Sequence, residues 1–178
     1  MTRGASLMRH HLAVAGCVLL VALGGCGYQP LYATTDNGST GQDLALVNVG
    51  VVRDRAGQEL HNYLRDEINP TGRPGGAARY DLEIDLTETR EALAIRTDET
   101  ATRYNLNQIA TFRLRDLESG RIVLNGTSQA AVSYNVLNND FNNVVSENDA
   151  RRRGARELAD DIRLRLAAYL NARRQRAG

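Results

Sequence analysis

The stretch 79–89, RYDLEIDLTET, decides the fold that this sequence predicts. Apolar side chains take every second position and polar ones lie between them: Tyr80, Leu82, Ile84 and Leu86 alternate with Asp81, Glu83, Asp85 and Thr87. This period of two is typical of a strand with one buried and one solvated face. Residues 91–96, EALAIR, extend the same strand. The apolar side needs a second layer, so we expect a sheet that is covered on one face.

Two later segments alternate in the same way. The first runs from Tyr104 to Arg115, and the second runs from Ile122 to Val136. Residues 118–121, ESGR, form a turn between them, in which glycine tolerates a positive φ. Consecutive alternating strands joined by short connections predict an antiparallel meander of three strands.

A fourth strand and a helix are predicted before the meander. Residues 44–52, LALVNVGVV, form a short apolar run rich in β-branched side chains, which indicates a buried strand. The segment 53–70 follows, and its apolar residues fall at helical spacing until Pro70 ends the pattern. They form one stripe: Leu60, Tyr63, Leu64 and Ile68.

A second helix is predicted at the C-terminal end. Ser146 followed by Asp149 resembles a capping box, and the helical pattern continues to about Arg174. Arginines and aspartates fill the other faces around one apolar stripe: Leu158, Ile162, Leu166, Tyr169 and Leu170.

The expected fold class is therefore α+β in the order β-α-β-β-β-α. The sheet has four mostly antiparallel strands, and two helices pack on one of its faces. We assign this single domain to residues 44–178. Residues 33–43, ATTDNGSTGQD, are small and polar and predict a flexible tether before the domain.

The first 25 residues are typical of a signal for export. Arg3 and Arg9 provide a basic start, and an apolar run from Leu12 to Leu23 follows. A helix of that length covers about 18 Å, which is short of the roughly 30 Å hydrocarbon core of a membrane. We therefore predict that residues 1–25 are a cleaved signal peptide rather than a membrane span. Met8 is an alternative start that leaves this interpretation unchanged.

The signal ends at a cysteine that has a specific use. The residues from Leu23 to Cys26 resemble the lipobox of bacterial lipoproteins, in which the cysteine is acylated and becomes the new N-terminus. Cys26 is therefore the predicted lipidation site, and residues 26–43 form the acylated N-terminus and the tether. A second match ending at Cys17 is rejected because only two apolar residues precede it. Lipidation accounts for an unpaired cysteine in an exported chain.

Composition excludes several classes of enzyme. All 22 basic residues are arginine, so neither a P-loop nor a pyridoxal phosphate site can be built. His61 is the only histidine beyond the signal, and no HExxH, GxSxG or CxxC motif occurs. The net charge of +1 becomes −1 when Arg3 and Arg9 leave with the signal, which gives no basic field for nucleic acid. We expect a non-enzymatic protein that binds neither a metal nor a cofactor, apart from its covalent lipid.

Two groups of arginines are candidate ligand sites, because guanidinium groups bind phosphate in a bidentate manner. One group flanks the hairpin between the first two long strands, and the other opens the C-terminal helix: Arg90, Arg96 and Arg103, and Arg151, Arg152 and Arg153. Solubilising surface charge is the alternative interpretation of both groups.

These features together resemble a known family. The sequence CGYQPLY after the signal, the tether, the order of elements and the helix that opens SENDARRRGARELADDIRLRL are similar to the LptE family of LPS-assembly lipoproteins, in its alphaproteobacterial form. The resemblance implies an outer-membrane lipoprotein, anchored on the periplasmic side, that plugs the LptD β-barrel and helps to assemble it. It also implies contact with lipopolysaccharide during its insertion into the outer leaflet, and no enzymatic activity.

The resemblance gives the arginines a role, since lipid A carries phosphates. An alternative partner is an ABC-type lipid transporter or a secretin, which a lipid-anchored accessory protein would serve. The anchor and a small domain fit these systems as well, so the identity of the partner distinguishes them.

Overall fold

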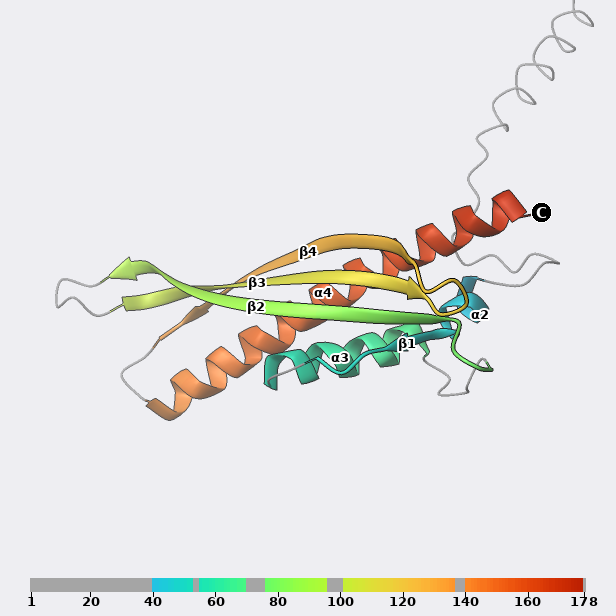
Figure 1. Cartoon of the computed structure of the whole chain (residues 1–178). Coiled ribbons are helices and arrows are strands. Elements are labelled where there is room, and N and C mark those ends of the chain that lie inside the picture. The colour runs from blue at the N-terminus through green and yellow to red at the C-terminus, as the bar shows by residue number, and fades with distance from the viewer. Residues whose placement is uncertain (1–39, 53–54, 70–75, 96–100, 137–139, 178) are drawn as a thin grey trace, which may run out of the picture. The chain divides into compact units, whose positions relative to one another are not determined.

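The computed structural model describes residues 40–52, 55–69, 76–95, 101–136 and 140–177 (Figure 1). The predicted signal peptide, Cys26, most of the predicted tether and Arg96 lie outside these residues. Along the chain the elements are α2 (Thr40–Leu44), β1 (Val47–Val49), α3 (Arg55–Ile68), β2 (Tyr80–Ile95), β3 (Ala101–Asp116), β4 (Ile122–Asn135) and α4 (Asp140–Ala177).

The four strands form one sheet in the order β1-β2-β3-β4. β1 is parallel to β2, whereas β2 pairs antiparallel with β3, and β3 with β4. Figure 1 shows the three long strands running side by side, with the short β1 at one end of β2. The predicted α+β fold with a four-stranded, mostly antiparallel sheet is confirmed, and α2 is an addition to it.

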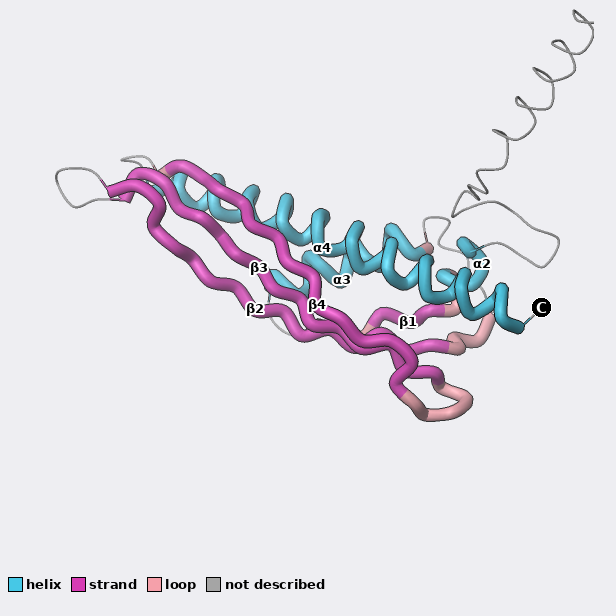
Figure 2. Tube along the Cα trace, turned by 90° about the horizontal axis from the view of Figure 1, so that it is seen from above, coloured by secondary structure: helices cyan, strands magenta, loops and turns pink. Residues whose placement is uncertain are grey.

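The helices α3 and α4 cover one face of the sheet (Figure 2). Between Tyr80 and Arg90 of β2, Tyr104 and Leu114 of β3, and Leu124 and Tyr134 of β4, the even-numbered residues point to this face, as the alternation of the sequence predicts. The predicted stripes of both helices meet them in the core, where the most deeply buried side chains are Leu60, Leu64, Leu82, Phe112, Leu114, Leu158, Ile162 and Leu166.

The other face of the sheet is polar, and no described helix packs on it (Figure 2). Charged side chains pair across neighbouring strands there. Arg113 of β3 contacts Asp85 at 3.1 Å and Glu83 at 3.8 Å, and Arg115 contacts Glu83 at 3.0 Å. We call this surface the open face.

The predicted strand over residues 44–52 is much shorter in the structure. Only Val47–Val49 pair with β2, and the ladder ends where Gly50 N–H donates to the Leu82 carbonyl. Leu44 is buried but belongs to α2, and Val52 is buried but belongs to the loop after β1. An apolar run reports burial rather than conformation, so it did not distinguish a strand from its flanking helix and loop.

The end of the predicted tether is also ordered. Residues 40–43 form α2 together with Leu44, and Ala45 N–H donates to the Gly41 carbonyl at 3.1 Å. The Asp43 carboxylate pairs with Arg174 of α4, which holds α2 against the C-terminal helix.

The C-terminal helix begins at Asp140, so the predicted capping box is wrong. Ser146 and Asp149 lie inside α4. Glu147 and Asp149 form ion pairs with arginines four residues later, and pairs at this spacing stabilise a helix locally. The polar segment before them therefore continues the helix instead of capping it.

Candidate functional site

The structure brings one arginine from each predicted group into a single polar cluster. Arg90 lies on β2 and Arg151 lies on α4, and both pair with the Glu147 carboxylate. Glu88 and Gln108 complete the group, which we call the distal cluster because it lies next to the main core on the side toward the β2–β3 hairpin. All three strand residues are at even positions, so they point toward α4.

Arg151 uses most of its donors inside the distal cluster. Its Nε lies 3.1 Å from a Glu88 oxygen, one Nη donates to Glu147, and the other lies 3.2 Å from the Asn148 side-chain oxygen. Burial lowers the pKa of Arg151, but hydrogen bonding and charge attraction to Glu88 and Glu147 outweigh it and raise the pKa above its ordinary value. Arg151 therefore stays charged and links α4 to β2 through its ion pair with Glu88.

Arg90 is held less tightly and faces solvent more. Its Nη1 lies 3.4 Å from Glu147, and its guanidinium lies 5.0 Å from the centre of the Tyr104 ring. The Arg90 side chain is 53% exposed. Because an arginine carries five N–H donors, Arg90 has capacity for an external anion.

Gln108 is buried beneath α4, with 1% of its surface exposed. Its Nε2 donates to the Glu88 carboxylate at 2.5 Å, and its Oε1 lies directly below Gly154. A Cβ at position 154 would come within 2.0 Å of that oxygen. Glycine is therefore required for α4 to pass this closely over β3.

Two tyrosines pack beside the distal cluster. The rings of Tyr104 and Tyr134 are stacked, with their centres 5.9 Å apart. Tyr134 joins Leu106 and Ala150 in a small apolar cluster that is separate from the main core. Burial raises the pKa of the Tyr134 hydroxyl, so this group stays neutral at physiological pH.

The charges of the distal cluster balance, since two arginines face two glutamates. Such a group can fix the position of α4, and it can present the exposed side of Arg90 to a ligand. Of the two predicted arginines that it contains, Arg90 is therefore better placed for binding, and Arg151 is better placed as a support.

The other predicted arginines lie elsewhere. Arg103 is at an odd position of β3 and is exposed on the open face, on the opposite side of the sheet from Arg90. Arg152 and Arg153 are exposed on α4 and pair with Asp149, and Arg153 also donates to the Ser133 carbonyl at 3.4 Å. The two predicted groups therefore do not form two compact sites.

Sequence reasoning missed the partners of these arginines. The even-numbered positions of β2 and β3 are apolar in the main core, but Glu88 and Gln108 are polar residues at even positions. This change from apolar to polar side chains on the buried face is the signal that could have identified them. Glu147 could have been found from its spacing to Arg151 on a helix.

Two further observations concern the part of the chain that the structure describes. It holds no group of three or more His, Cys, Asp or Glu side chains that could bind a metal ion. None of its helices combines the length and the apolar character that crossing a membrane requires.

Comparison with known proteins shows the relatives of this chain. A family profile described as LptE, lipopolysaccharide-assembly, matches residues 42–166. A proposed lipoprotein from Caulobacter crescentus CB15 has a similar crystal structure, with 28% identity and a TM-score of 0.61 over 75% of this chain and 96% of that chain. A minor lipoprotein from Acinetobacter baumannii shares the fold, with 21% identity and a TM-score of 0.54 over 68% of this chain and 90% of that one. An uncharacterized protein of Rickettsia prowazekii is 24% identical over 152 residues, which cover 85% of this chain and 93% of that protein.

Proposed function

Because this chain belongs to the LptE family of lipopolysaccharide-assembly proteins, we propose that it is the lipoprotein subunit of an outer-membrane lipopolysaccharide translocon. In this role the domain plugs the LptD β-barrel, helps the barrel to assemble, and contacts lipopolysaccharide on its way to the outer leaflet. It acts by binding and carries out no chemical step. The family match over residues 42–166 is the observation that carries the proposal.

The open face supports a position inside a barrel. The lumen of a large outer-membrane barrel is polar, so a plug must present polar side chains to it. The open face does so with side chains from β2 and β3: Asp81, Glu83, Asn105, Asn107, Arg113 and Arg115. Several of these charges already pair with one another, which lowers the cost of moving them away from bulk water.

The arginines near the hairpin support contact with lipopolysaccharide. Arg90 is half-exposed, and the Arg103 side chain is exposed on the other side of the hairpin. Arg90 can bind a lipid A phosphate on the helix-covered side of the sheet and Arg103 can bind another on the open face, with Arg96 between them in sequence. Arg151, Arg152 and Arg153 are consecutive on α4 and can each assist, although each pairs with a carboxylate of α4.

The anchor belongs to the same proposal. Acylation of Cys26 would attach the chain to the periplasmic side of the outer membrane, and stable attachment needs more than one acyl chain. The residues from Cys26 to α2 would then form the connection between the membrane and the domain.

A pull-down tests the partner directly. A tagged chain is purified from detergent-solubilised outer membranes, and the co-purifying protein and lipid are identified. We expect a large β-barrel in a one-to-one ratio, together with lipopolysaccharide. Recovery of an inner-membrane permease, of a secretin, or of no partner would contradict the translocon role. A Cys26→Ala variant is the matched control for the anchor, and we expect it to leave the membrane fraction.

A further inference from the structure

The strand β2 has a long edge that no described residue pairs with. On the β1 side, pairing covers only Tyr80, Asp81 and Leu82, and one further bond joins Gly50 N–H to the Leu82 carbonyl. On its other side, β2 pairs with β3 along its whole length. Figure 2 shows β2 as the outer strand from the end of β1 toward the hairpin.

The direction of the unpaired backbone groups follows from the existing bonds. Tyr80 N–H donates to the Leu46 carbonyl, and the Leu82 carbonyl accepts from Gly50, so the backbone groups of even residues point toward the β1 side. Backbone direction alternates along a strand. The N–H and C=O groups of Ile84, Leu86, Glu88 and Arg90 therefore point outward along the free edge.

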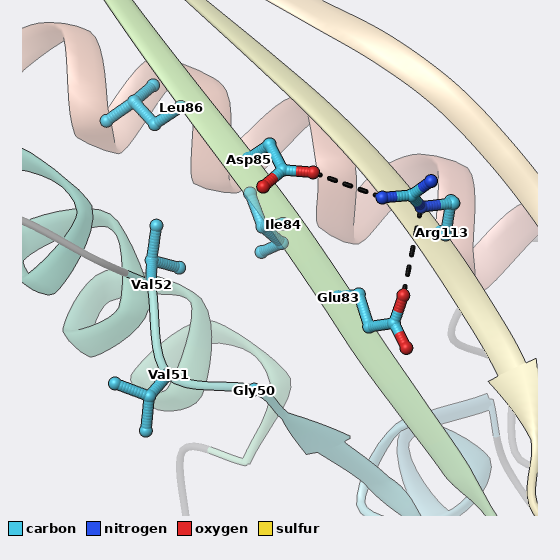
Figure 3. Close-up of a pocket in the computed structure, with 8 residues that line it drawn as sticks. All are labelled: Gly50, Val51, Val52, Glu83, Ile84, Asp85, Leu86 and Arg113. Carbon is cyan, nitrogen blue, oxygen red and sulfur yellow. Dashed lines mark hydrogen bonds and ion pairs between the residues drawn. The ribbon is translucent and has the colours of Figure 1, made fainter.

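A cavity of about 460 Å³ lies where β1 leaves this edge (Figure 3). Val51, Val52, Ile84 and Leu86 give it an apolar side, and the Val51 side chain is 86% exposed. Its lining also includes Glu83, Asp85 and Arg113 from the open face. The cavity takes residues from both faces because it lies at the edge of the sheet.

β1 shows which side chains this edge accepts. Val47 and Val49 point to the helix-covered face and pack with the core. Asn48, between them, points to the open face and donates to the Asp81 carboxylate at 2.6 Å. A segment that continues the line of β1 would therefore place apolar residues beside Ile84 and Leu86, and hydrogen-bond donors beside Glu83 and Asp85.

We propose that the free edge of β2 from Ile84 to Arg90 is a docking site for an extended segment of a partner protein, in which apolar residues alternate with basic residues. The segment adds a strand in line with β1, and its backbone pairs with the outward groups of β2. Its apolar side chains enter the cavity beside Val52, and its basic side chains face the carboxylates of the open face. The proposal does not depend on the identity of the barrel partner.

Charge argues against a second copy of the same edge as the occupant. Two β2 edges would set Glu83, Asp85 and Glu91 of one chain beside the same acidic row of the other. Like charges on neighbouring strands are destabilising. A basic segment instead adds donors to carboxylates that still have free acceptor positions beside their bonds to Arg113 and Arg115.

Amide hydrogen exchange of the full chain tests the proposal without any substitution. The probe is an acetylated, amidated peptide of four Val-Arg repeats, and the matched control is a peptide of four Val-Glu repeats. Without peptide, we expect the amides of Ile84, Leu86 and Glu88 to exchange quickly and those of Glu83, Asp85 and Thr87 to be protected by β3. The Val-Arg peptide should slow the first set about tenfold or more, while the Val-Glu peptide should not.

Variants then test which groups of β2 bind the peptide. Leu86→Pro removes an outward N–H and leaves the β2–β3 ladder intact, so it should weaken binding of the Val-Arg peptide about tenfold. Leu86→Val shortens the same side chain but keeps the N–H, so it should weaken binding much less than Leu86→Pro does. Asp85→Arg should weaken binding of the Val-Arg peptide and strengthen binding of the Val-Glu peptide.

Three results would overturn the proposal. One is an absence of protection at the even amides when the Val-Arg peptide is present. Another is equal protection by both peptides. The third is protection that grows with protein concentration and without peptide, which would show that a second copy occupies the edge.

Discussion

Asp116 shows how a single carboxylate joins the sheet to the C-terminal helix. It lies at the end of β3 with 2% of its surface exposed. Its Oδ1 accepts from the backbone N–H groups of Glu118 and Ser119, both at 3.1 Å, and its Oδ2 accepts from Arg173 of α4 at 2.9 Å. The hydrogen bond from Ser119 and the bond from Arg173 hold the pKa of Asp116 below its ordinary value.

This lowered pKa predicts a pH dependence of stability. The contribution of Asp116 is complete above its unfolded pKa of about 3.9, and it is lost as the pH falls through the lower folded value. Asp116→Asn should therefore lower the free energy of unfolding by about 1–3 kcal/mol at pH 7, and the deficit should shrink below about pH 4. Urea unfolding between pH 7 and pH 2.5 measures it. Glu118→Gln removes an exposed carboxylate nearby and should change stability by less than about 0.5 kcal/mol. A deficit that stays constant with pH would contradict the assignment.

The arginines near the hairpin should contribute to the affinity for lipopolysaccharide. Replacing Arg90, Arg96 and Arg103 together with Ala should weaken binding of purified lipopolysaccharide about tenfold or more, because charge-assisted bonds to phosphate are lost. The matched control replaces three arginines outside this region with Ala: Arg65, Arg121 and Arg176, which are all exposed. Fluorescence titration with purified lipopolysaccharide measures both variants. Unchanged binding by the first variant, or an equal loss in both, would remove the specific role of these arginines.

At the scale of elements, the crossing of α4 over β3 depends on one glycine. Alanine normally stabilises a helix by about 1 kcal/mol relative to glycine. At position 154 the added Cβ would lie 2.0 Å from the buried Gln108 Oε1, and the Gln108 amide is held in place because its Nε2 donates to Glu88. We therefore predict that Gly154→Ala lowers the free energy of unfolding by about 1–2 kcal/mol.

A double-mutant cycle separates this contact from helix propensity. In a Gln108→Ala background the space above residue 108 is free, and Gly154→Ala should then be neutral or stabilising in urea unfolding. The same loss in both backgrounds would mean that the close contact with Gln108 is not the cause.

The long elements could be predicted from the sequence, whereas the short ones could not. Alternation over β2, β3 and β4 and the stripes of α3 and α4 report which side chains are buried, and long periodic segments leave little ambiguity. β1 and α2 are too short to show a period, so the run 44–52 was predicted as one strand. The start of α4 at Asp140 was also not predicted, because Val144 and Val145 are exposed and do not extend the apolar stripe of the helix.

At the scale of the whole molecule, the candidate site depends on how distant segments meet. The sequence identifies Arg90 and Arg151 as members of two separate groups. Helical spacing indicates the pair of Glu147 with Arg151, but nothing in the segment of Arg90 indicates that Arg90 would reach the same carboxylate. That meeting follows from the path of α4 across the sheet, which is a property of the packed domain. The separation of Arg90 from Arg103 could have been predicted, because even and odd positions of paired strands point to opposite faces.

The same packing buries more apolar surface in the main core than at the end of the domain that contains the distal cluster. Among the residues that the structure describes, the main core between the sheet and the helices contains 20 buried residues, whereas the smaller cluster contains only Leu106, Tyr134 and Ala150. Polar contacts of the distal cluster replace apolar burial at that end. Because such contacts add less net free energy than apolar burial, the distal end should open more readily than the core.

Amide hydrogen exchange of the native chain measures this difference. We predict that the amides of Leu106 and Tyr134 exchange through openings that cost at least about 1.4 kcal/mol less than those of Phe112 and Leu158, a tenfold difference in rate. The comparison is matched, because all four residues are buried and lie within regular elements. Equal opening free energies would mean that the distal cluster holds its end as firmly as the apolar core. A looser distal end would let the segments that carry Arg90 and Arg103 adjust to a bulky ligand, since ligand-binding regions are drawn from the less stable parts of a fold.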